Sequence, residues 1–304
     1  MSARPVRLGT RGSPLALVQA ELTIRAMATA RPALRDHIDV IVFETRGDQR
    51  RDCPIEHIGG RGVFTDELDR AVAQGDVDFA VHSVKDLPVP LAGGLLLAAT
   101  LERADPREAF VSTRHASLAA VPRGGTMGSA SLRREALVKA LRPDLDFALL
   151  RGNVEERVAA LDRRGLDGTI LAVAGLARLG LQRHIREILS PETLMPDPGQ
   201  GAIGLVCRGD NLVARALAAR INHAATLQAV TAERAFLAIA GGRFVVGALA
   251  VVSGSTLTLS ASAALPGGPV IWRESSQGPA ETPVAVAQKL AAALPAVAVR
   301  GERA

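Results

Sequence analysis

The sequence predicts an α/β protein made of two successive units of alternating strands and helices, followed by a small α+β domain. Its 304 residues are enough for two or three domains with their own cores. Up to about Asn222, short apolar runs alternate with helix-length segments, which is typical of parallel βαβ units. Beyond Asn222 a long helix precedes alternating hairpin strands and a closing helix, and this change of pattern marks the last domain.

The first unit is expected to open as strand, turn and helix between Arg7 and Ala30. Ser13 is a natural helix N-cap and Pro14 suits the first helical position. Arg11 and Ser13 therefore lie at a helix N-terminus, where backbone N–H groups can bind an anion.

A strand over 38–43 follows, and then a polar, glycine-bearing segment from Gln49 to Gly62. This segment is long for a loop in a compact domain, which makes it a candidate lid over a site. It leads into a helix that Gly75 ends.

The stretch from Asp78 to Pro90, DFAVHSVKDLPVP, concentrates the candidate chemistry. It begins as a short buried strand, Phe79 to Val81, and then turns polar within four residues. The polar residues are His82, Ser83, Lys85 and Asp86. Open α/β sheets bind ligands at this end of their strands. Only three of the 36 basic residues are lysines, so a lysine here indicates a specific role rather than general positive charge.

The second unit places two arginines in the first turn of a helix. In GTMGSASLRREALVKAL, Ser131 is the expected N-cap, and Arg133 and Arg134 follow it. Two cations at a helix N-terminus oppose the helix macrodipole, and no buried apolar role explains them. We therefore expect them to bind an anionic ligand rather than to lie on the surface by chance.

The design then repeats along the chain. A strand ends at Arg151, Gly152 allows close approach of a ligand, and Asn153 with Glu156 makes a capping box for the next helix. The strand TILAVA and a short helical segment containing Arg178 follow. No internal sequence repeat is present.

The composition excludes several classes of function. No apolar run approaches a membrane span and no signal-peptide pattern opens the chain, so a cytoplasmic protein without membrane contact is expected. Cys53 and Cys207 lie far apart and the six histidines lack metal-ligand spacing, so no metal site is expected. The net charge is +5, but aromatic residues make up only 3%, which argues against nucleic acid as a partner. Arginines spread through glycine-rich turns instead favour a small ligand that carries carboxylates.

The segment VHSVKDLP, residues 81–88, resembles the active-site segment of the porphobilinogen deaminase (hydroxymethylbilane synthase) family. Similar matches run through nearly the whole chain: TRGSPLAL, GGRGVF, ERADPREAFV, RGNVEER, GLARLGL and MPDPGQGAIGLVCR. The resemblance implies two periplasmic-binding-protein-like lobes joined by two crossings into a hinged cleft. Residues 1–101 with 200–219 would form one lobe and 102–199 the other, while 220–304 would form the C-terminal α+β domain of a monomeric protein.

The resemblance also implies a reaction. Family members condense units of the small molecule porphobilinogen, with loss of ammonia, to the linear tetrapyrrole hydroxymethylbilane of haem biosynthesis, and build it on a dipyrromethane cofactor. Asp86 would stabilise the cationic azafulvene formed when ammonia leaves, and Lys85 would be the second catalytic residue. The carboxylate arms would be bound by Arg11, Ser13, Arg61, Ser83, Ser129, Arg133, Arg134, Arg151, Arg157 and Arg178.

At one position the chain departs from the family pattern. Family members attach dipyrromethane through a thioether to a Cys in a GGC loop after the AERAF helix, and Arg243 occupies that Cys position here. A guanidinium group stays protonated and is not a nucleophile, so it cannot form the thioether. Cys207 lies in the segment that returns to the first lobe and Cys53 lies in the candidate lid, so neither is in the GGC loop.

Three interpretations follow from this departure. The protein is a deaminase that holds its primer non-covalently, with Arg243 pairing a cofactor carboxylate; or it is a divergent pyrrole-condensing paralogue, without a covalent cofactor, that joins fewer units. The third interpretation is a non-catalytic module that binds small anions. A binding module needs the arginines but not Asp86, so the retained Asp86 and Lys85 favour the two enzymes.

Overall fold

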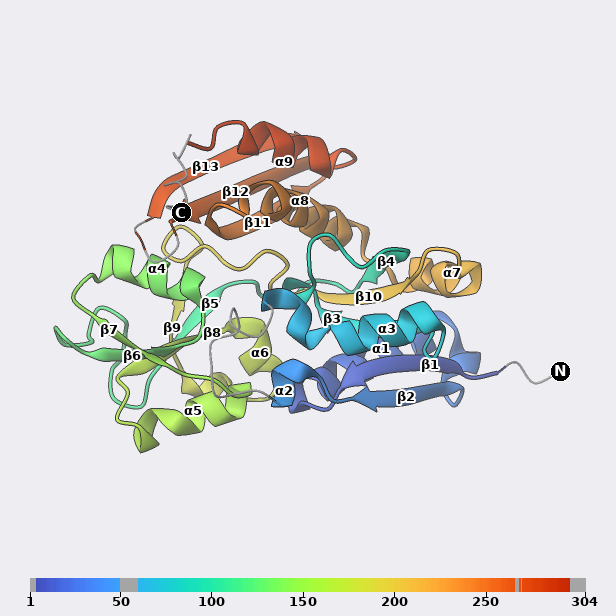
Figure 1. The fold of residues 1–304 in the computed structure, drawn as a ribbon, viewed down its shortest axis with the longest axis horizontal. Helices are drawn as coiled ribbons and strands as arrows, with labels where there is room; N and C mark the ends of the chain where they lie inside the picture. Colours follow the sequence, from blue (N-terminus) through green and yellow to red (C-terminus); the bar gives the residue numbers. More distant parts are fainter. Residues whose placement is uncertain (1–3, 50–59, 266–267, 269, 296–304) are drawn as a thin grey trace, which may run out of the picture.

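The structure is a computed structural model that describes residues 4–49, 60–265, 268 and 270–295 (Figure 1). Its α-helices are α1 Pro14–Ala30, α2 Arg46–Gln49, α3 Asp66–Gln74, α4 Leu132–Leu141, α5 Val154–Arg163, α6 Val173–Arg178, α7 Leu212–Ile221, α8 Ala224–Ala240 and α9 Pro283–Ala291. Its strands are β1 Val6–Arg11, β2 Ile38–Phe43, β3 Phe79–Ser83, β4 Leu95–Thr100, β5 Glu108–Val111, β6 Thr126–Ser129, β7 Asp146–Leu149, β8 Gly168–Ala172, β9 Ile185–Leu189, β10 Ile203–Arg208, β11 Val245–Ser253, β12 Thr256–Ala264 and β13 Val270–Pro279. Short 3-10 helices are η1 Pro32–Leu34, η3 Gly60–Phe64, η4 Val84–Asp86 and η5 Gln182–His184.

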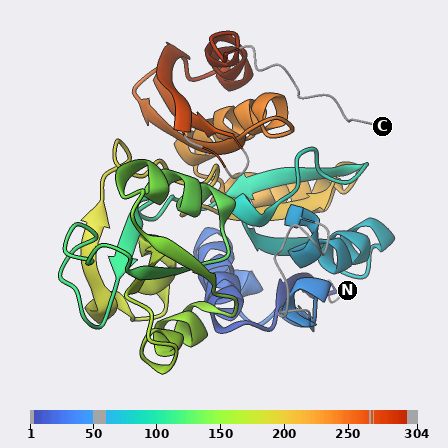
Figure 2. The same ribbon diagram turned by 60° about the vertical axis from the view of Figure 1, so that its left-hand side comes forward.

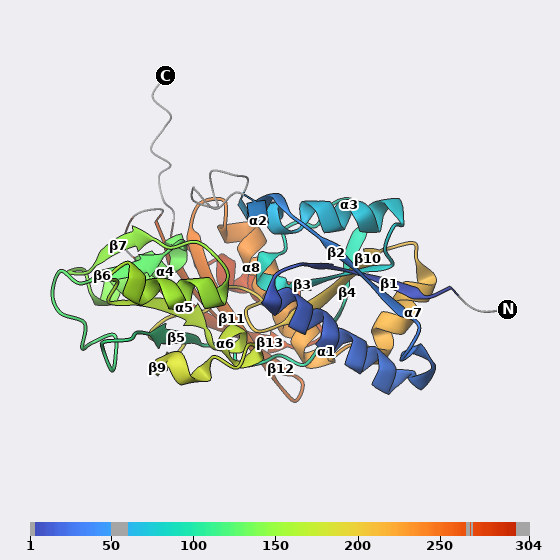
Figure 3. The ribbon, with the colours of Figure 1, turned by 90° about the horizontal axis from the view of Figure 1, so that it is seen from below.

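The first lobe is a five-stranded sheet covered by helices on both faces. Its strand order is β2-β1-β3-β10-β4, with β1 parallel to β2 and β3, and β10 antiparallel to both β3 and β4. Helices α1 and α7 pack on one face through a cluster that includes Met27, Phe79 and Leu217. Helix α3 covers the opposite face, where Leu68 and Val72 pack against the sheet (Figure 3). The carboxyl ends of β1 and β3 point toward the second lobe (Figure 1).

The second lobe has the same topology, strand for strand. Its order is β7-β6-β8-β5-β9, with β6 parallel to β7 and β8, and β5 antiparallel to β8 and β9. Helix α4 packs on one face, where Leu137 meets Phe110, and α5 and α6 pack on the other, where Leu161 meets Leu171. Because no internal repeat is visible in the sequence, the repetition is one of topology alone.

The sheets differ from the expected parallel βαβ arrangement in one strand each. The antiparallel strands, β5 and β10, are the two that follow directly after the chain crosses between lobes. Strand β10 begins at Ile203, which lies opposite Ser83 at the carboxyl end of β3. A strand that enters from the interlobe side must run against strands that end there, so the crossings impose the antiparallel direction.

The helix ends follow the sequence predictions. The Ser13 hydroxyl accepts a hydrogen bond from the Ala16 N–H at 3.4 Å and Pro14 is the first residue of α1. Gly75 ends α3 with φ of 79°, a left-handed conformation that favours glycine. The capping box of Asn153 and Glu156 is present at the start of α5. Local sequence chemistry is therefore sufficient to predict these boundaries.

The C-terminal domain is a three-stranded antiparallel sheet, β11-β12-β13, covered by α8 and α9. The hairpin strands and the two helices are confirmed, while β13 was not expected from the sequence. The domain lies across the junction of both lobes (Figure 2). Its α8 contacts β4 of the first lobe, and its sheet contacts α4 of the second.

A buried carboxylate holds the three parts of the molecule together. Glu233 on α8 is fully buried and accepts hydrogen bonds from both terminal nitrogens of Arg103, at 2.5 and 3.1 Å, in the first crossing. It also accepts from the N–H of Gly199 in the second crossing at 2.6 Å and from the N–H of Ala250 in β11 at 2.7 Å. Because every partner lies in a different segment, this carboxylate sets how the crossings meet the C-terminal domain.

Candidate active site

A cavity of about 880 Å³ lies where the two lobes meet the C-terminal domain. Most residues that the sequence predicted for the site line this cavity: Arg11, Ser13, Ser83, Lys85, Asp86, Arg133, Arg134, Arg151, Arg157 and Arg178. They come from both lobes, so the fold brings together side chains that are up to 167 positions apart, between Arg11 and Arg178.

Three other predicted positions are placed differently. Ser129 is not in the cavity lining, and its hydroxyl accepts a hydrogen bond from the Ser131 N–H at 3.0 Å, so it shapes the turn before α4. Arg243 is exposed, is not in the lining, and stacks over the ring of Phe244 at 5.6 Å. Arg61 belongs to η3, but its side chain lies outside the described residues, as do Cys53 and most of the candidate lid.

Three helix N-termini reach the same cavity. Ser13 at α1, Ser131 at α4 and Asn153 at α5 all belong to the lining, and each caps its helix with a side-chain oxygen. Helix N-termini carry partial positive charge, so together they favour a negatively charged ligand.

Asp86 occupies the end of η4, the short turn that follows β3. Its side chain is half-buried and lines the cavity, and within the described part of the chain it has no hydrogen bond or ion pair. The charge of Asp86 instead acts at longer range, since it raises the pKa values of Lys85 and Arg157 against the lowering effect of burial. A carboxylate without a partner, in a site lined by cations, is available to a ligand.

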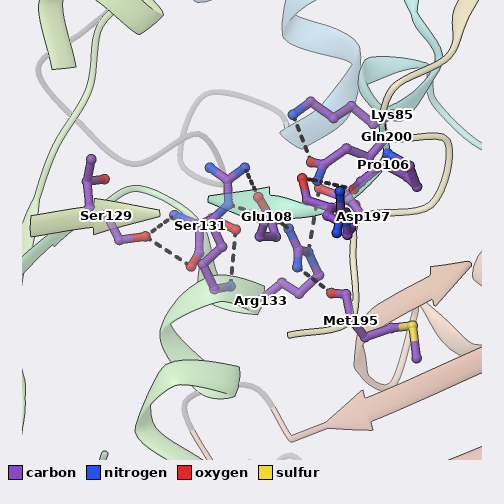
Figure 4. A network of polar contacts seen from close by, with 12 residues as sticks. Lys85, Pro106, Glu108, Ser129, Ser131, Arg133, Met195, Asp197 and Gln200 are labelled. Carbon is purple, nitrogen blue, oxygen red and sulfur yellow. Dashed lines mark hydrogen bonds and ion pairs between the residues drawn. The ribbon is translucent and has the colours of Figure 1, made fainter. Parts of the chain in front are cut away.

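Lys85 is oriented by a buried amide. Its Nζ donates to Oε1 of Gln200 at 3.2 Å, and Nε2 of Gln200 donates to the carbonyl of Pro106 at 2.8 Å (Figure 4). Burial, reinforced by the charge of Arg134, lowers the pKa of Lys85. Lys85 on the first lobe is thereby connected to both interlobe crossings.

Arg133 and Arg134 share a partner that the sequence analysis did not anticipate. Glu108 is fully buried at the start of β5, and both guanidinium groups form ion pairs with it. Figure 4 shows Glu108 together with Arg133. Arg134 donates to its two carboxylate oxygens at 3.0 and 2.9 Å, and Arg133 also donates to the carbonyl of Met195 at 2.6 Å. An ion pair inside the protein was not among the alternatives weighed for these arginines; both line the cavity, and their binding of an anionic ligand stays a prediction.

Burial alone would raise the pKa of Glu108, but the charges of Arg134 and Arg133 hold it well below its usual range. One carboxylate thus faces two guanidinium groups, and the trio keeps a net positive charge beside the cavity.

Arg11 is paired within the first lobe. Its guanidinium forms an ion pair with Asp48 of α2 and lies over the ring of Phe64 at 4.3 Å. Burial would raise the pKa of Asp48, but hydrogen bonding and the charge of Arg11 outweigh burial and lower it. Arg11 is therefore held in place before any ligand arrives.

Arg157 and Arg178 are bonded to the backbone rather than to carboxylates. Nε of Arg157 donates to the carbonyl of Gly152 at 2.7 Å, and a terminal nitrogen of Arg178 donates to the carbonyl of Gly201 at 2.7 Å. Burial lowers the pKa of each to about 10, and for Arg157 the charges of Arg134 and Arg151 add to this effect. Desolvated cations that repel one another gain most from an anionic ligand.

The C-terminal domain contributes an apolar wall to the cavity, made by Leu237, Gly241, Phe244, Val245 and Val246. This wall is next in sequence to Arg243, the position at which the resemblance places the attachment Cys. The described cysteine, Cys207, is fully buried in the core of the first lobe and is not in the lining. Within the described part of the chain, the cavity therefore offers no thiol.

Several lining residues were not predicted from the sequence, among them Gln19, Asp48 and Asp197. Nε2 of Gln19 donates to the hydroxyl of Ser83 at 2.7 Å, and Asp197 lies 3.8 Å from Nε of Arg133. These residues stand in ordinary helix and loop segments whose sequence does not indicate a site. Only their contacts in the folded structure show that they belong to it.

The fold and the cavity define a two-lobed α/β protein with a polar interlobe site. It is similar to the VFT2 domain of BvgS from Bordetella pertussis (12% identity, 71% of this chain and 86% of that one, TM-score 0.45). It is also similar to a TRAP periplasmic solute binding protein from Desulfovibrio salexigens (9%, 72% and 72%, TM-score 0.43) and to a periplasmic binding protein from Salmonella typhimurium (13%, 72% and 92%, TM-score 0.40).

The chain belongs to the porphobilinogen deaminase family. Residues 6–216 match the family model described as "Porphobilinogen deaminase, dipyromethane cofactor binding domain". The family is a transferase family of tetrapyrrole biosynthesis, and the resemblance found in the sequence is therefore confirmed.

None of the helices in the described ranges is long and apolar enough to cross a membrane. Among the residues whose placement is described, no group of three or more His, Cys, Asp or Glu side chains could hold a metal ion.

Proposed function

We propose that the protein is a transferase that condenses porphobilinogen, with loss of ammonia, into a linear oligopyrrole, in the standard case hydroxymethylbilane. The observation that supports this most is Asp86, a carboxylate with no hydrogen bond or ion pair among the described residues, in a cavity whose other charged side chains are mostly cationic. A site built only to bind carboxylates gains nothing from such a group. A site that must stabilise a transient cation requires one.

Porphobilinogen carries a pyrrole N–H, an aminomethyl group, and acetate and propionate arms. The arms suit the guanidinium groups and the three helix N-termini that line the cavity. When the C–N bond breaks, its electron pair leaves with ammonia and the ring becomes a cationic azafulvene. The carboxylate of Asp86 would lie beside this cation, and its fixed charge would lower the barrier. Lys85, held by Gln200, would orient the arm nearest to the reacting carbon.

Arg157 provides a direct test of arm binding. Changing Arg157 to Met is expected to weaken porphobilinogen binding about 10-fold to 100-fold, because a hydrogen bond to a charged group contributes about 1.5–3 kcal/mol. Binding is measured by isothermal titration calorimetry. Arg163→Met on the same helix is the matched control, because Arg163 is exposed and bonded only to its own helix at Ala159. Equal weakening in both variants would contradict the assigned role of Arg157.

The charge of the family's dipyrromethane suits this cavity, but the cavity lacks the residue to which family members attach it. The cations and the apolar wall suit a carboxylated dipyrrole, whereas the described lining provides no thiol for a thioether. Arg243 is exposed and outside the lining, so its pairing with a cofactor carboxylate has no support from its position. We propose that no dipyrromethane is attached covalently through the Arg243 loop.

Intact-mass spectrometry tests the attachment. The purified protein is expected to have the mass of the polypeptide alone under denaturing conditions, because guanidinium forms no thioether. A covalent dipyrromethane adduct would contradict this, and peptide mapping would then locate the attachment residue. The matched comparison is Arg243→Cys, which restores the family's thiol and is expected to gain the adduct when porphobilinogen is supplied.

The missing thiol also favours a second candidate function, a paralogue that joins fewer units and releases a shorter product. Product analysis separates the two candidates. A linear tetrapyrrole supports the standard reaction, whereas consumption of porphobilinogen that ends in shorter chains supports the paralogue.

A further inference from the structure

A buried histidine and a buried aspartate lie directly behind the candidate active site. His82 in β3 and Asp69 in α3 are each only 4% exposed. Nε2 of His82 lies 3.7 Å from Oδ1 of Asp69, which is too long for a hydrogen bond, and neither atom has another partner in the described part of the chain. A buried polar atom without a hydrogen bond lowers the stability of the fold by about 1–3 kcal/mol. The pair therefore destabilises the fold, and a purely structural role does not explain it.

A small side cavity of about 50 Å³ lies next to the main cavity, and it is lined by His82 but not by Asp69. His82 and Asp86 both line it, and Arg11, Ser13 and Ser83 line both cavities. A polar cavity of this size has room for ordered water, which needs about 10–15 Å³. The side cavity can therefore connect the imidazole to the neighbourhood of the Asp86 carboxylate through water.

The charged groups around His82 come from three elements. Asp69 faces it from α3, with Asp66 nearby; Arg11 lies on β1; and Asp86 lies on η4. Burial and the charge of Arg11 lower the pKa of His82 to about 3. Burial and Asp66 raise the pKa of Asp69 to about 6, against a hydrogen bond from Thr65. At neutral pH a neutral imidazole thus lies beside a carboxylate, and the carboxylate is the more basic group of the two.

A second His–Asp pair in the same chain shows the difference. Nε2 of His115 lies 2.9 Å from Oδ1 of Asp167, within hydrogen-bond distance, and neither residue lines either of these cavities. The His115–Asp167 pair is therefore an ordinary hydrogen-bonded contact. Of the two pairs, only His82–Asp69 has atoms without a hydrogen bond among the described residues and a residue that lines a cavity next to the candidate active site.

We propose that the His82–Asp69 pair is a proton relay for the condensation step, and this inference rests on the proposed function. The α-carbon of one pyrrole attacks the methylene of the azafulvene made from another, forming a C–C bond and leaving the attacking ring with one proton too many. That proton passes through water in the side cavity to the imidazole of His82 and on to the carboxylate of Asp69, which is the more basic group. It is then returned to the ammonia released earlier, which departs as ammonium, so one C–N bond is broken, one C–C bond is formed and no proton is left over.

Two positioning variants test the relay. His82→Asn is expected to lower the kcat for porphobilinogen consumption about 100-fold, and Asp69→Asn about 10-fold, while KM stays within about twofold. The wild type is expected to lose activity as the pH falls through about 6, where Asp69 takes up a proton, and Asp69→Asn should lack this acid limb. His115→Asn and Asp167→Asn are the matched controls, expected to change neither kcat nor its pH profile.

The outcomes separate the relay from the proposed function. Wild-type protein that consumes no porphobilinogen would overturn the proposed function and the relay with it. Wild-type turnover with an unaltered kcat and acid limb in the variants would overturn the relay alone. Where His82→Asn does not fold, His82→Gln and the solvent isotope effect on kcat replace it: a larger effect in the wild type than in Asp69→Asn supports the relay, and equal effects refute it.

Discussion

Asp86→Ala is expected to reduce porphobilinogen consumption about 1,000-fold, which is the upper range for removing one preorganised group that stabilises developing charge. The variant keeps the cations that bind the substrate arms, so substrate binding should persist while the azafulvene cation loses its counter-charge. Its stability should change by less than about 1 kcal/mol, because within the described residues no hydrogen bond to Asp86 is lost. Turnover is measured as porphobilinogen consumed and ammonia released.

Asp146→Ala is the control, because Asp146 is exposed at the start of β7, a strand none of whose residues lines the cavity. It should leave turnover at the wild-type level. Asp86→Asn separates charge from shape: it should be nearly as inactive as Asp86→Ala if the carboxylate acts by its charge. Full activity in either Asp86 variant would refute the proposed mechanism.

Glu108→Gln should have the largest effect on stability, lowering the free energy of unfolding by about 3–5 kcal/mol. The substitution leaves the buried guanidinium groups of Arg133 and Arg134 without their shared negative partner. Urea unfolding followed by circular dichroism measures the change. Glu135→Gln on α4 is the control, since its ion pair with Lys139 one turn away contributes only about 0.3–0.5 kcal/mol. Similar losses of stability in both variants would show that the buried trio contributes no more to stability than an exposed ion pair.

The same carboxylate predicts a pH dependence of stability. The pKa of Glu108 is lowered on folding from an ordinary value of 4.5, so its contribution is fully present above about pH 4.5 and is lost as the pH falls below that value. Glu108→Gln should therefore unfold with a weaker pH dependence in this acidic range than the wild type.

Many residues of the site could be predicted from the sequence because they stand at helix N-termini or directly after strands. Ser13, Ser131 and Asn153 are helix caps, and Asp86 follows a buried strand, so local patterns located them before any contact was known. Arg11, Arg133, Arg134 and Arg151 likewise stand at strand ends or in the first turn of a helix, whereas Arg157 lies within α5 and Arg178 ends α6, and only the family resemblance predicted these two. Asp48, which lines the cavity, and Gln200, which accepts a hydrogen bond from Lys85, lack such a local signal and were missed for that reason.

Local chemistry could not reveal partnerships between distant segments. Glu108 stands 25 positions before Arg133 in an unremarkable strand, and Glu233 lies within an ordinary helix 130 positions after Arg103. The repeated topology of the two lobes was also hidden, because β5 and β10 owe their direction to the crossings rather than to their own residues.

The chain's own residues were thus enough to determine the family, the lobed α/β architecture, the helix boundaries and most of the charged groups of the site, because each depends on short stretches of sequence. Only the folded chain decided which of those charges are neutralised within the protein and which remain for a ligand. Arg133 and Arg134 are bound to Glu108, whereas Asp86 has no bonded partner among the described residues. The reason is physical: the effect of a charge depends on the burial and the neighbours that tertiary packing provides, and these are not local properties of the sequence.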